Sequence, residues 1–275
     1  MKEEKIKKMV RNRYAKIATT KSSCCSNSCS CDSQSSDEMS KLMGYNEKEL
    51  ASVPEGSNMG LGCGNPTALA SLKKGETVLD LGSGGGFDCF LAARKVGKEG
   101  RVIGVDMTPE MIDKARANAR KSKYTNVEFR LGEIENLPVA DNSVNVIISN
   151  CVINLSPDKK RVFEEAYRVV APNGRLMVSD IVLLETLPEV VRKNVEAYGA
   201  CIAGAETKDK YLGLIEKAGF KDVRVVEEIN FPIEDVLSEP SVQKVVKALA
   251  LSDEQLKKIE KSIVSIKVSA LKGGT

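Results

Sequence analysis

A glycine-rich run between a short apolar segment and a helix-like segment constrains the fold of this chain more than any other feature. The run Asp80–Gly86 follows the apolar residues Val78 and Leu79. Glycines in such a turn let a ligand lie against bare backbone, close to the positive end of the following helix. About twenty residues further on, the segment Arg101–Asp106 ends in an acid, and a carboxylate there accepts hydrogen bonds from ribose hydroxyls in nucleotide-binding α/β folds. The pattern predicts a nucleotide-like ligand on an α/β fold.

The spacing of the glycines narrows the class of ligand that the turn can bind. The dinucleotide fingerprint G-x-G-x-x-G needs a third glycine at the position where this chain has Phe87. The run reads G-x-G-x-G instead, and it resembles motif I of the S-adenosylmethionine-dependent methyltransferases. The resemblance implies S-adenosylmethionine as the cofactor.

Composition restricts the chemistry and the partners. The 275 residues include no His, which excludes a histidine base, a catalytic triad and a His-ligated metal. The net charge of +3, with no continuous basic and aromatic surface, argues against nucleic acid. The N-terminus lacks the apolar region of a signal peptide, and no apolar run is long enough to span a membrane. We therefore expect a cytoplasmic protein without a membrane partner, in which the eight cysteines are buried, catalytic or metal-binding.

The order of apolar and amphipathic segments indicates the fold class. Their alternation from Pro66 onward predicts an α/β, Rossmann-like fold with a doubly wound, mostly parallel seven-stranded sheet. Strands are predicted at 77–79, 102–106, 127–131, 143–149, 175–179 and 223–227, and helices at 5–18, 67–72, 87–97, 108–123, 158–170, 189–199 and 208–218.

Three parts of the chain follow from this order. Residues 1–60 are expected to form an N-terminal helix and a mobile Cys-rich loop. Residues 61–228 form the cofactor-binding core, with an inserted substrate-site segment near 181–207. Residues 229–275, which include the alternating apolar run Ile263–Leu271, are expected to form a small C-terminal α+β appendage.

Candidate cofactor residues follow from the rule that ligands of open α/β sheets bind outside the carboxyl ends of the strands. The glycine turn would hold the methionine part, Asp106 the ribose diol, and Met107 would pack on the adenine. The segment Gly132–Pro138 resembles the methyltransferase loop whose acid meets the adenine amine, with a solvated loop acid as the alternative for Glu133. The predicted cofactor-binding residues are Asp80, Gly82, Ser83, Gly84, Gly86, Asp106, Met107, Gly132, Glu133, Ile134 and Asn150.

Three cysteine-containing segments carry a more specific resemblance. They are Gly62–Pro66 (G-C-G-N-P), Ser149–Leu155 (S-N-C-V-I-N-L) and Gly199–Ala205 (G-A-C-I-A-G-A). Together with the D-L-G-S-G-x-G-x-D-C form of motif I, they make the chain similar to the arsenite methyltransferase family from Val10 to about Glu228. The resemblance implies that Cys63, Cys151 and Cys201 bind trivalent arsenic, alone or as a thiol conjugate, and that its methylation serves detoxification.

The chemistry of arsenic explains why three thiols suit this reaction. Trivalent arsenic is soft and thiophilic, and soft ions select thiolate ligands. Three sulfurs would hold it in a pyramid with one lone pair free to attack a sulfonium methyl group, so no general base is needed. A chain without histidine is compatible with this mechanism.

The remaining cysteines have other interpretations. Cys89 lies in an apolar helical segment and is expected to pack in the core. The cluster Cys24, Cys25, Cys29 and Cys31 resembles the N-terminal cysteines of the family, which capture arsenic or take part in thiol exchange; metal binding and no role at all are the alternatives. The expected partners are arsenite and a thiol reductant, either thioredoxin or a low-molecular-weight thiol.

Two rival functions remain open. Segments such as Val170–Leu176 resemble those of methyltransferases acting on a carbon of a quinone or sterol, whose reaction needs no thiols. A thiol-rich protein that binds a metalloid without turnover is the second rival. The intact glycine turn and Asp106 count against this second rival.

Overall fold

The structure, a computed structural model, describes residues 3–19, 36–192, 198, 201–230 and 253–274. Its strands are β1 (Thr77–Leu81), β2 (Arg101–Asp106), β3 (Val127–Leu131), β4 (Val144–Asn150), β5 (Val170–Leu183), β6 (Lys221–Asn230) and β7 (Ile263–Leu271). Its helices are α1 (Glu3–Thr19), α2 (Ser36–Leu42), α3 (Glu47–Ala51), α4 (Pro66–Leu69), α5 (Phe87–Val96), α6 (Pro109–Lys121), the short 3-10 helix η1 (Ile153–Leu155), α7 (Lys159–Val169), α8 (Glu189–Arg192), α10 (Lys208–Lys217) and α13 (Asp253–Ser262).

All the described strands belong to one seven-stranded sheet in the order β3-β2-β1-β4-β5-β7-β6. The first five strands of this order are parallel, and β7 runs antiparallel to both of its neighbours. Strand order reverses between β1 and β4, so the carboxyl ends of these two strands form the edge where open sheets bind ligands. The predicted fold class, a doubly wound and mostly parallel sheet, is confirmed.

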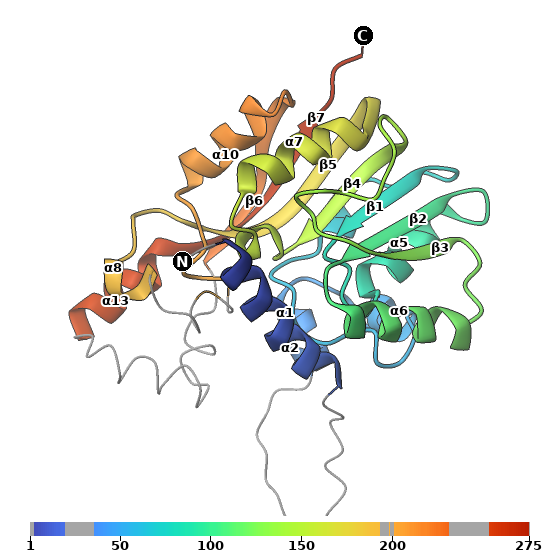
Figure 1. Cartoon of the computed structure of the whole chain (residues 1–275), viewed down its shortest axis with the longest axis horizontal. Coiled ribbons are helices and arrows are strands. Elements are labelled where there is room, and N and C mark those ends of the chain that lie inside the picture. The colour runs from blue at the N-terminus through green and yellow to red at the C-terminus, as the bar shows by residue number, and fades with distance from the viewer. Residues whose placement is uncertain (1–2, 20–35, 193–197, 199–200, 231–252, 275) are drawn as a thin grey trace, which may run out of the picture.

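Alternation along β1 explains why helices cover both faces (Figure 1). Val78 packs with residues of α5 and α6, whereas Leu79 packs with residues of α7 and α10. Successive side chains of a strand point to opposite faces, so a strand that is apolar at both positions must be covered twice. The glycine turn after β1 therefore lies at the edge of a sheet that is buried on both sides.

The assignment of Ile263–Leu271 to a C-terminal appendage is wrong. This segment is β7, which lies inside the sheet between β5 and β6 and pairs with both over most of its length. Its apolar side chains are almost completely buried, because a strand with neighbours on both sides and helices on both faces has little access to water. Alternation alone does not distinguish such a strand from one at the surface of a separate subdomain.

The central position of β7 leads to a stability prediction. Ile266 is completely buried in the main core, and we expect Ile266→Ala to lower the free energy of unfolding by about 2–5 kcal/mol. Chemical denaturation should show one cooperative transition that moves to lower denaturant. The matched control is Leu271→Ala at the 39% exposed end of the same strand, which should have little effect. A second transition, with the first unmoved, would mean that β7 folds separately from the sheet.

Differences from the predicted elements are otherwise small. Strand β5 extends in both directions and includes the predicted turn at 171–174, and α2 begins inside the predicted N-terminal loop. The cysteine cluster at 24–31 lies outside the described residues. Within the described residues, no helix is both long and apolar enough to cross a membrane.

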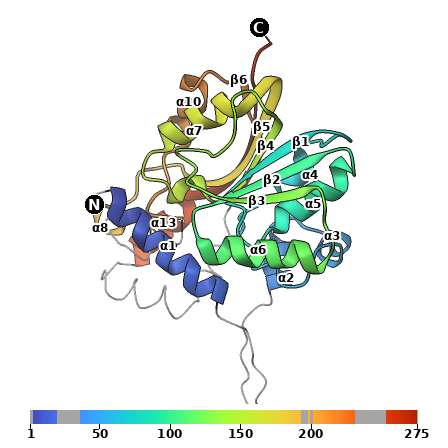
Figure 2. The same cartoon turned by 45° about the vertical axis from the view of Figure 1, so that its right-hand side comes forward.

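Helix α1 is far from α6 in the sequence, but the two helices lie side by side in space (Figure 2). It crosses in front of the carboxyl ends of the strands, where the ligand edge is. Its buried residues Ile6 and Val10 give it an apolar side that packs against the rest of the fold.

Candidate functional site

A cavity of about 1140 Å³, part of it open to solvent, lies at the carboxyl ends of β1, β2 and β4. Nine of the predicted cofactor residues line it, together with Cys151 of the predicted thiol set: Asp80, Gly82, Ser83, Gly84, Asp106, Met107, Gly132, Ile134 and Asn150. The cavity therefore unites residues from the turns after four different strands.

The glycine turn forms one wall of the cavity, and its shape depends on glycine. Gly82 has a φ of +70°, and a Cβ atom there would lie 2.3 Å from Cγ2 of Val152. The N–H groups of Gly82 and Ser83 donate to the carbonyl of Val105, at 2.7 and 3.0 Å, which fixes the turn against β2. The buried Ser83 hydroxyl has no hydrogen-bond partner among the described residues. An unpaired hydroxyl beside bare backbone fits a polar ligand such as the amino acid part of S-adenosylmethionine.

Asp106 closes the adjacent wall of the cavity. Its carboxylate accepts hydrogen bonds from the backbone N–H groups of Gly84 at 3.0 Å and Thr108 at 2.8 Å. These two bonds orient the carboxylate, while burial raises the pKa of Asp106. The Thr108 side chain, at the start of α6, makes no capping bond to this helix.

A buried polar network links the cavity to the first cysteine segment through Asn150. The Asn150 amide nitrogen donates to Tyr45 Oη at 2.9 Å, to Asp88 at 3.1 Å and to the carbonyl of Gly64 at 2.8 Å. Its oxygen accepts the backbone N–H of Cys63 at 2.9 Å. Asn150 is therefore a positioning residue for the Cys63 segment as well as a wall of the cavity.

Two acids of this region are strongly affected by burial. Burial raises the pKa of Asp88 to about 6, and raises that of Asp80 well above its ordinary value, with repulsion from Asp88 adding to it. Cys89 donates from its sulfur to Asp80 at 3.2 Å and is completely buried among apolar side chains, as expected for a core cysteine.

The three predicted arsenic ligands come together beside the cavity. Cys63, Cys151 and Cys201 are all buried, free and members of one apolar cluster. The Cys201 sulfur donates to the carbonyl of Cys151 at 3.1 Å, and the Cys63 sulfur donates to the carbonyl of Ser179 at 3.5 Å. The fold thus brings Cys63, Cys151 and Cys201, which are up to 138 residues apart (63 to 201), into one buried cluster, in which the Cys63 and Cys151 sulfurs lie within 4.8 Å of each other.

The backbone conformation and the raised pKa values of these cysteines distinguish them from ordinary cysteines. Cys151 and Cys201 have φ values of +59° and +64°, which residues with a side chain rarely adopt and which are concentrated at functional sites. Burial raises the pKa of Cys63, and hydrogen bonds to Cys201 and Cys63 raise the pKa of Cys151 well above its ordinary value. The Cys63 and Cys151 thiols are therefore protonated at neutral pH before a ligand arrives.

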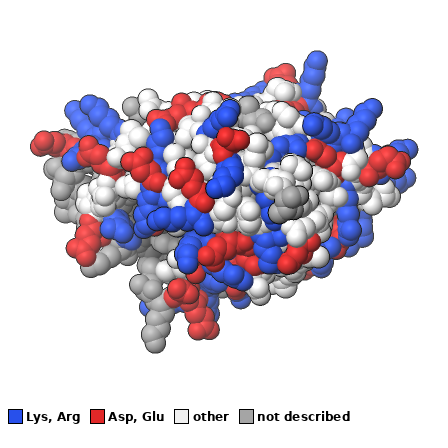
Figure 3. Space-filling view, turned by 90° about the horizontal axis from the view of Figure 1, so that it is seen from above, with Lys and Arg blue, Asp and Glu red and all other residues white. Residues whose placement is uncertain are grey.

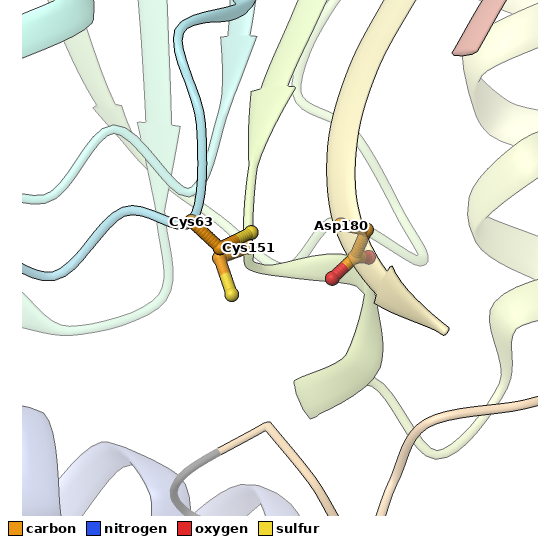
Figure 4. Close-up of side chains that lie close together, drawn as sticks. All are labelled: Cys63, Cys151 and Asp180. Atoms are coloured by element: carbon orange, nitrogen blue, oxygen red, sulfur yellow. The ribbon is translucent and has the colours of Figure 1, made fainter. Parts of the chain in front are cut away.

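A buried acid that we did not predict lies beside the thiols (Figure 4). One ligand atom each from Cys63, Cys151 and Asp180 lies within 4.8 Å of the others. Asp180 lies in the carboxyl half of β5, and the rule that selected the other candidates would have found it had it been applied to that strand. Burial raises the pKa of Asp180 to about 7.

The raised pKa of Asp180 leads to a prediction for stability against pH. The folded state holds this proton more tightly than the unfolded chain, so the contribution of Asp180 is greatest below pH 4 and is lost as the pH rises to about 7. The full change is up to about 4 kcal/mol at about 1.4 kcal/mol per pKa unit. Chemical denaturation of wild type and Asp180→Asn between pH 4 and 8 should show their stability difference changing in that window. A constant difference would contradict the assignment.

Helix α1 covers the cavity, which the sequence did not indicate. Lys7 and Tyr14 line it, and the Tyr14 hydroxyl is hydrogen-bonded to the Cys201 sulfur. Lys7 Nζ lies 2.7 Å from Glu133 and 3.3 Å from Glu135, and these ion pairs hold α1 to the loop after β3. Only the apolar spacing of the helix could have been read from the sequence, and that spacing does not say what the helix covers.

Glu133 and Gly86 are the predicted cofactor residues that the structure does not place on the cavity wall. The Glu133 carboxylate pairs with Lys7, and the neighbouring Glu135 lines the cavity instead. Gly86 has a φ of +93° at the start of α5, where a Cβ atom would lie 2.7 Å from Phe90. Its role is to allow the turn to enter the helix.

Surface charge is mixed over the face seen from above (Figure 3). Lys and Arg side chains alternate there with Asp and Glu. The described part of this face has no concentrated field of one sign that would steer a highly charged partner.

Comparisons with known proteins agree with this geometry. The family described as "Methyltransferase domain" matches residues 72–219. A protein named arsenite methyltransferase from Halobacterium salinarum is 51% identical over 231 residues, covering 81% of this chain and 59% of the relative. A protein of the same name from Aquipseudomonas alcaligenes is 40% identical, covering 82% of this chain and 65% of the relative. This chain thus spans about three fifths of the length of these curated relatives.

A solved structure provides a more complete match. The crystal structure of an arsenic (III) S-adenosylmethionine methyltransferase from Chlamydomonas reinhardtii aligns with a TM-score of 0.63 and 33% identity, covering 86% of this chain and 73% of that chain. The sheet order, the glycine turn and the domain match define a class I methyltransferase, whose cofactor is S-adenosylmethionine. Within this class, the chain belongs to the arsenite methyltransferase family.

Proposed function

We propose that this protein methylates trivalent arsenic bound by Cys63, Cys151 and Cys201. The observation that carries the proposal is the convergence of three buried, free thiols beside the cavity that the glycine turn and Asp106 form. Cys151 itself lines that cavity, so an atom held by the thiols faces the space for the cofactor.

The thiols act first by exchanging ligands with the arsenic. Each sulfur forms a bond to arsenic as a hydroxide leaves, and the thiol proton leaves with that hydroxide as water. Because the thiols of Cys63 and Cys151 are protonated in the free protein, they supply these protons themselves. No separate acid is required.

The protein then holds the two reactants in line. S-adenosylmethionine supplies an electrophilic sulfonium methyl group when bound. The glycine turn and Asp106 fix one reactant and the thiols the other, and such positioning can lower a barrier by about 7–11 kcal/mol. The arsenic lone pair forms the new bond to carbon as the carbon–sulfonium bond breaks, so no residue needs to remove a proton. Helix α1 borders this space through Lys7, Val10 and Tyr14.

The supporting parts of the proposal concern the segments around the site. We assign 181–207 as the substrate segment, because Cys201 and its hydrogen bond to Cys151 lie in it. A thiol reductant would return the arsenic to the trivalent state after each transfer. We retain the cysteine cluster at 24–31 as the candidate site for arsenic capture or thiol exchange. Four free described cysteines suit a reducing compartment.

The test is arsenic speciation after incubation of purified protein with S-adenosylmethionine, arsenite and a thiol reductant. We expect methylated arsenic that depends on all three reagents. Bound arsenite without a methylated product would favour the metalloid-binding protein instead. Neither binding nor product would point to an organic acceptor such as a quinone.

A further inference from the structure

The carboxylate of Asp180 has no role in binding arsenic through three thiols. Trivalent arsenic needs only the sulfurs, yet Asp180 lies with Cys63 and Cys151 so that one ligand atom of each lies within 4.8 Å of the others (Figure 4). All three residues are buried. They come from the loop before α4, the end of β4 and the carboxyl half of β5, so the tertiary structure assembles the group.

Asp180 is held as a metal-ligating carboxylate usually is. Its Oδ1 accepts hydrogen bonds from Asn154 Nδ2 at 2.8 Å and from the backbone N–H of Ile181 at 3.0 Å. Its Oδ2 accepts from Tyr211 Oη at 3.0 Å. Outer hydrogen bonds of this kind fix the orientation of ligating carboxylates.

The same carboxylate has no cationic partner. No Lys or Arg among the described residues forms an ion pair with it; the nearby Lys159 donates instead to the carbonyls of Asn154 and Ser156. A buried acid is normally paired with a positive charge or a metal ion. The carboxyl group is thus left free to accept a cation in place of its proton, and the two sulfurs next to it would select a thiophilic one.

Two thiolates and one carboxylate form a ligand set that suits zinc. Zn²⁺ takes four tetrahedral ligands from Cys, His, Asp and Glu. The Cys201 sulfur, which donates to the carbonyl of Cys151 at 3.1 Å, is a candidate for the fourth position. A three-coordinate arsenic atom and a four-coordinate zinc ion would thus differ in their use of Asp180.

We propose that Cys63, Cys151 and Asp180 form a binding site for Zn²⁺, and that the bound metal excludes arsenite from the same thiols. Binding forms two Zn–S bonds and one Zn–O bond and releases the two thiol protons and the proton held by Asp180 to solvent, with no change in oxidation state. The competition with arsenite rests on the proposed function, whereas the metal site does not. The site makes the enzyme sensitive to divalent thiophilic cations through a residue that arsenite does not need.

The first test measures zinc binding without an activity assay. Reduced full-length protein is titrated with zinc sulfate against a chromophoric chelator, in a background where the other candidate thiols are serine (Cys24, Cys25, Cys29 and Cys31). We expect one ion per chain, with Asp180→Asn weakening the affinity roughly tenfold or more. Asp209→Asn, an exposed acid of α10, is the control and should leave the affinity unchanged. Equal affinity in Asp180→Asn and its parent, or no binding, would overturn the proposal.

A second measurement uses the unmutated site, so that it does not depend on the variant's folding. Co²⁺ replaces Zn²⁺, and we expect a thiolate-to-cobalt charge-transfer band that disappears on titration with arsenite. A missing band, or one that persists in saturating arsenite, would overturn the shared site. Methylation of arsenite by chelator-treated enzyme tests the proposed function alone. If this enzyme does not methylate arsenite, the proposed function fails, whereas the zinc site is still tested by zinc binding and by the effect of Asp180→Asn.

Discussion

Replacing Cys151 or Cys201 by serine is expected to abolish arsenic methylation while S-adenosylmethionine still binds. Each substitution removes one of three sulfurs and leaves a hydroxyl, which is a hard donor that a soft metalloid does not select. Arsenic bound by two sulfurs is no longer fixed in line with the cofactor, and a loss of positioning costs on the order of 100-fold or more in rate. Arsenic speciation gives the rate, and calorimetric titration gives the cofactor affinity.

The fourth described cysteine supplies a matched control for these variants. Cys89 is as buried as the other three, but it lies in α5 among apolar side chains. Cys89→Ser keeps a donor for Asp80 and removes no proposed ligand, so methylation should persist. Wild-type rates from Cys151→Ser or Cys201→Ser would exclude the three-thiol mechanism. Equal losses from Cys89→Ser would show that the effect comes from stability.

Gly82→Ala is expected to lower cofactor affinity at least tenfold and to destabilise the protein. The φ of +70° costs a side chain about 1–2 kcal/mol. The new Cβ would also lie 2.7 Å from Cβ and 2.3 Å from Cγ2 of Val152, so the backbone must move. Val152 follows Cys151, and the shift would therefore disturb the thiols together with the cofactor turn. Calorimetric titration and thermal unfolding measure the two effects.

Two other glycines separate the causes of this effect. Gly84 also has a positive φ, +51°, but a Cβ there meets no protein atom within 4 Å, so the thermal unfolding of Gly84→Ala reports the backbone strain without the clash with Val152. Gly213 lies in α10, where a Cβ likewise has open space, and alanine there should be neutral or stabilising by up to about 1 kcal/mol. If Gly82→Ala behaves like Gly213→Ala, the turn does not depend on glycine in the way proposed here.

The course of the chain through the core was largely predictable from local patterns. Strand β3 has the predicted bounds, and β2 and β4 differ by one residue at their ends. Val78 and Leu79 pack on opposite faces because a strand covered twice must be apolar at successive positions. The glycine run and Asp106 indicated the cofactor wall for the same reason: these residues are close in sequence, and their turn geometry is local.

The elements that sequence reasoning missed depend on distant contacts. Strand β7 pairs with β5, about 90 residues earlier in the chain, and its alternating pattern does not indicate which strand it pairs with. Glu133 was expected at the adenine but pairs with Lys7, because α1 approaches the loop after β3 only in the folded chain. Tyr14 reaches Cys201 in the same way.

The sequence by itself determined the parallel sheet, the glycine turn and the identity of three cysteine segments, since periodicity, turn chemistry and motif spacing are local properties of the chain. Only the tertiary structure decided that three thiols from distant segments meet, that α1 covers them and that Asp180 lies beside them without a cation. The burial and the charge of a side chain at such a site depend on the residues from distant segments that surround it in the folded chain. They arise when segments that carry no mutual signal in the sequence pack against one another.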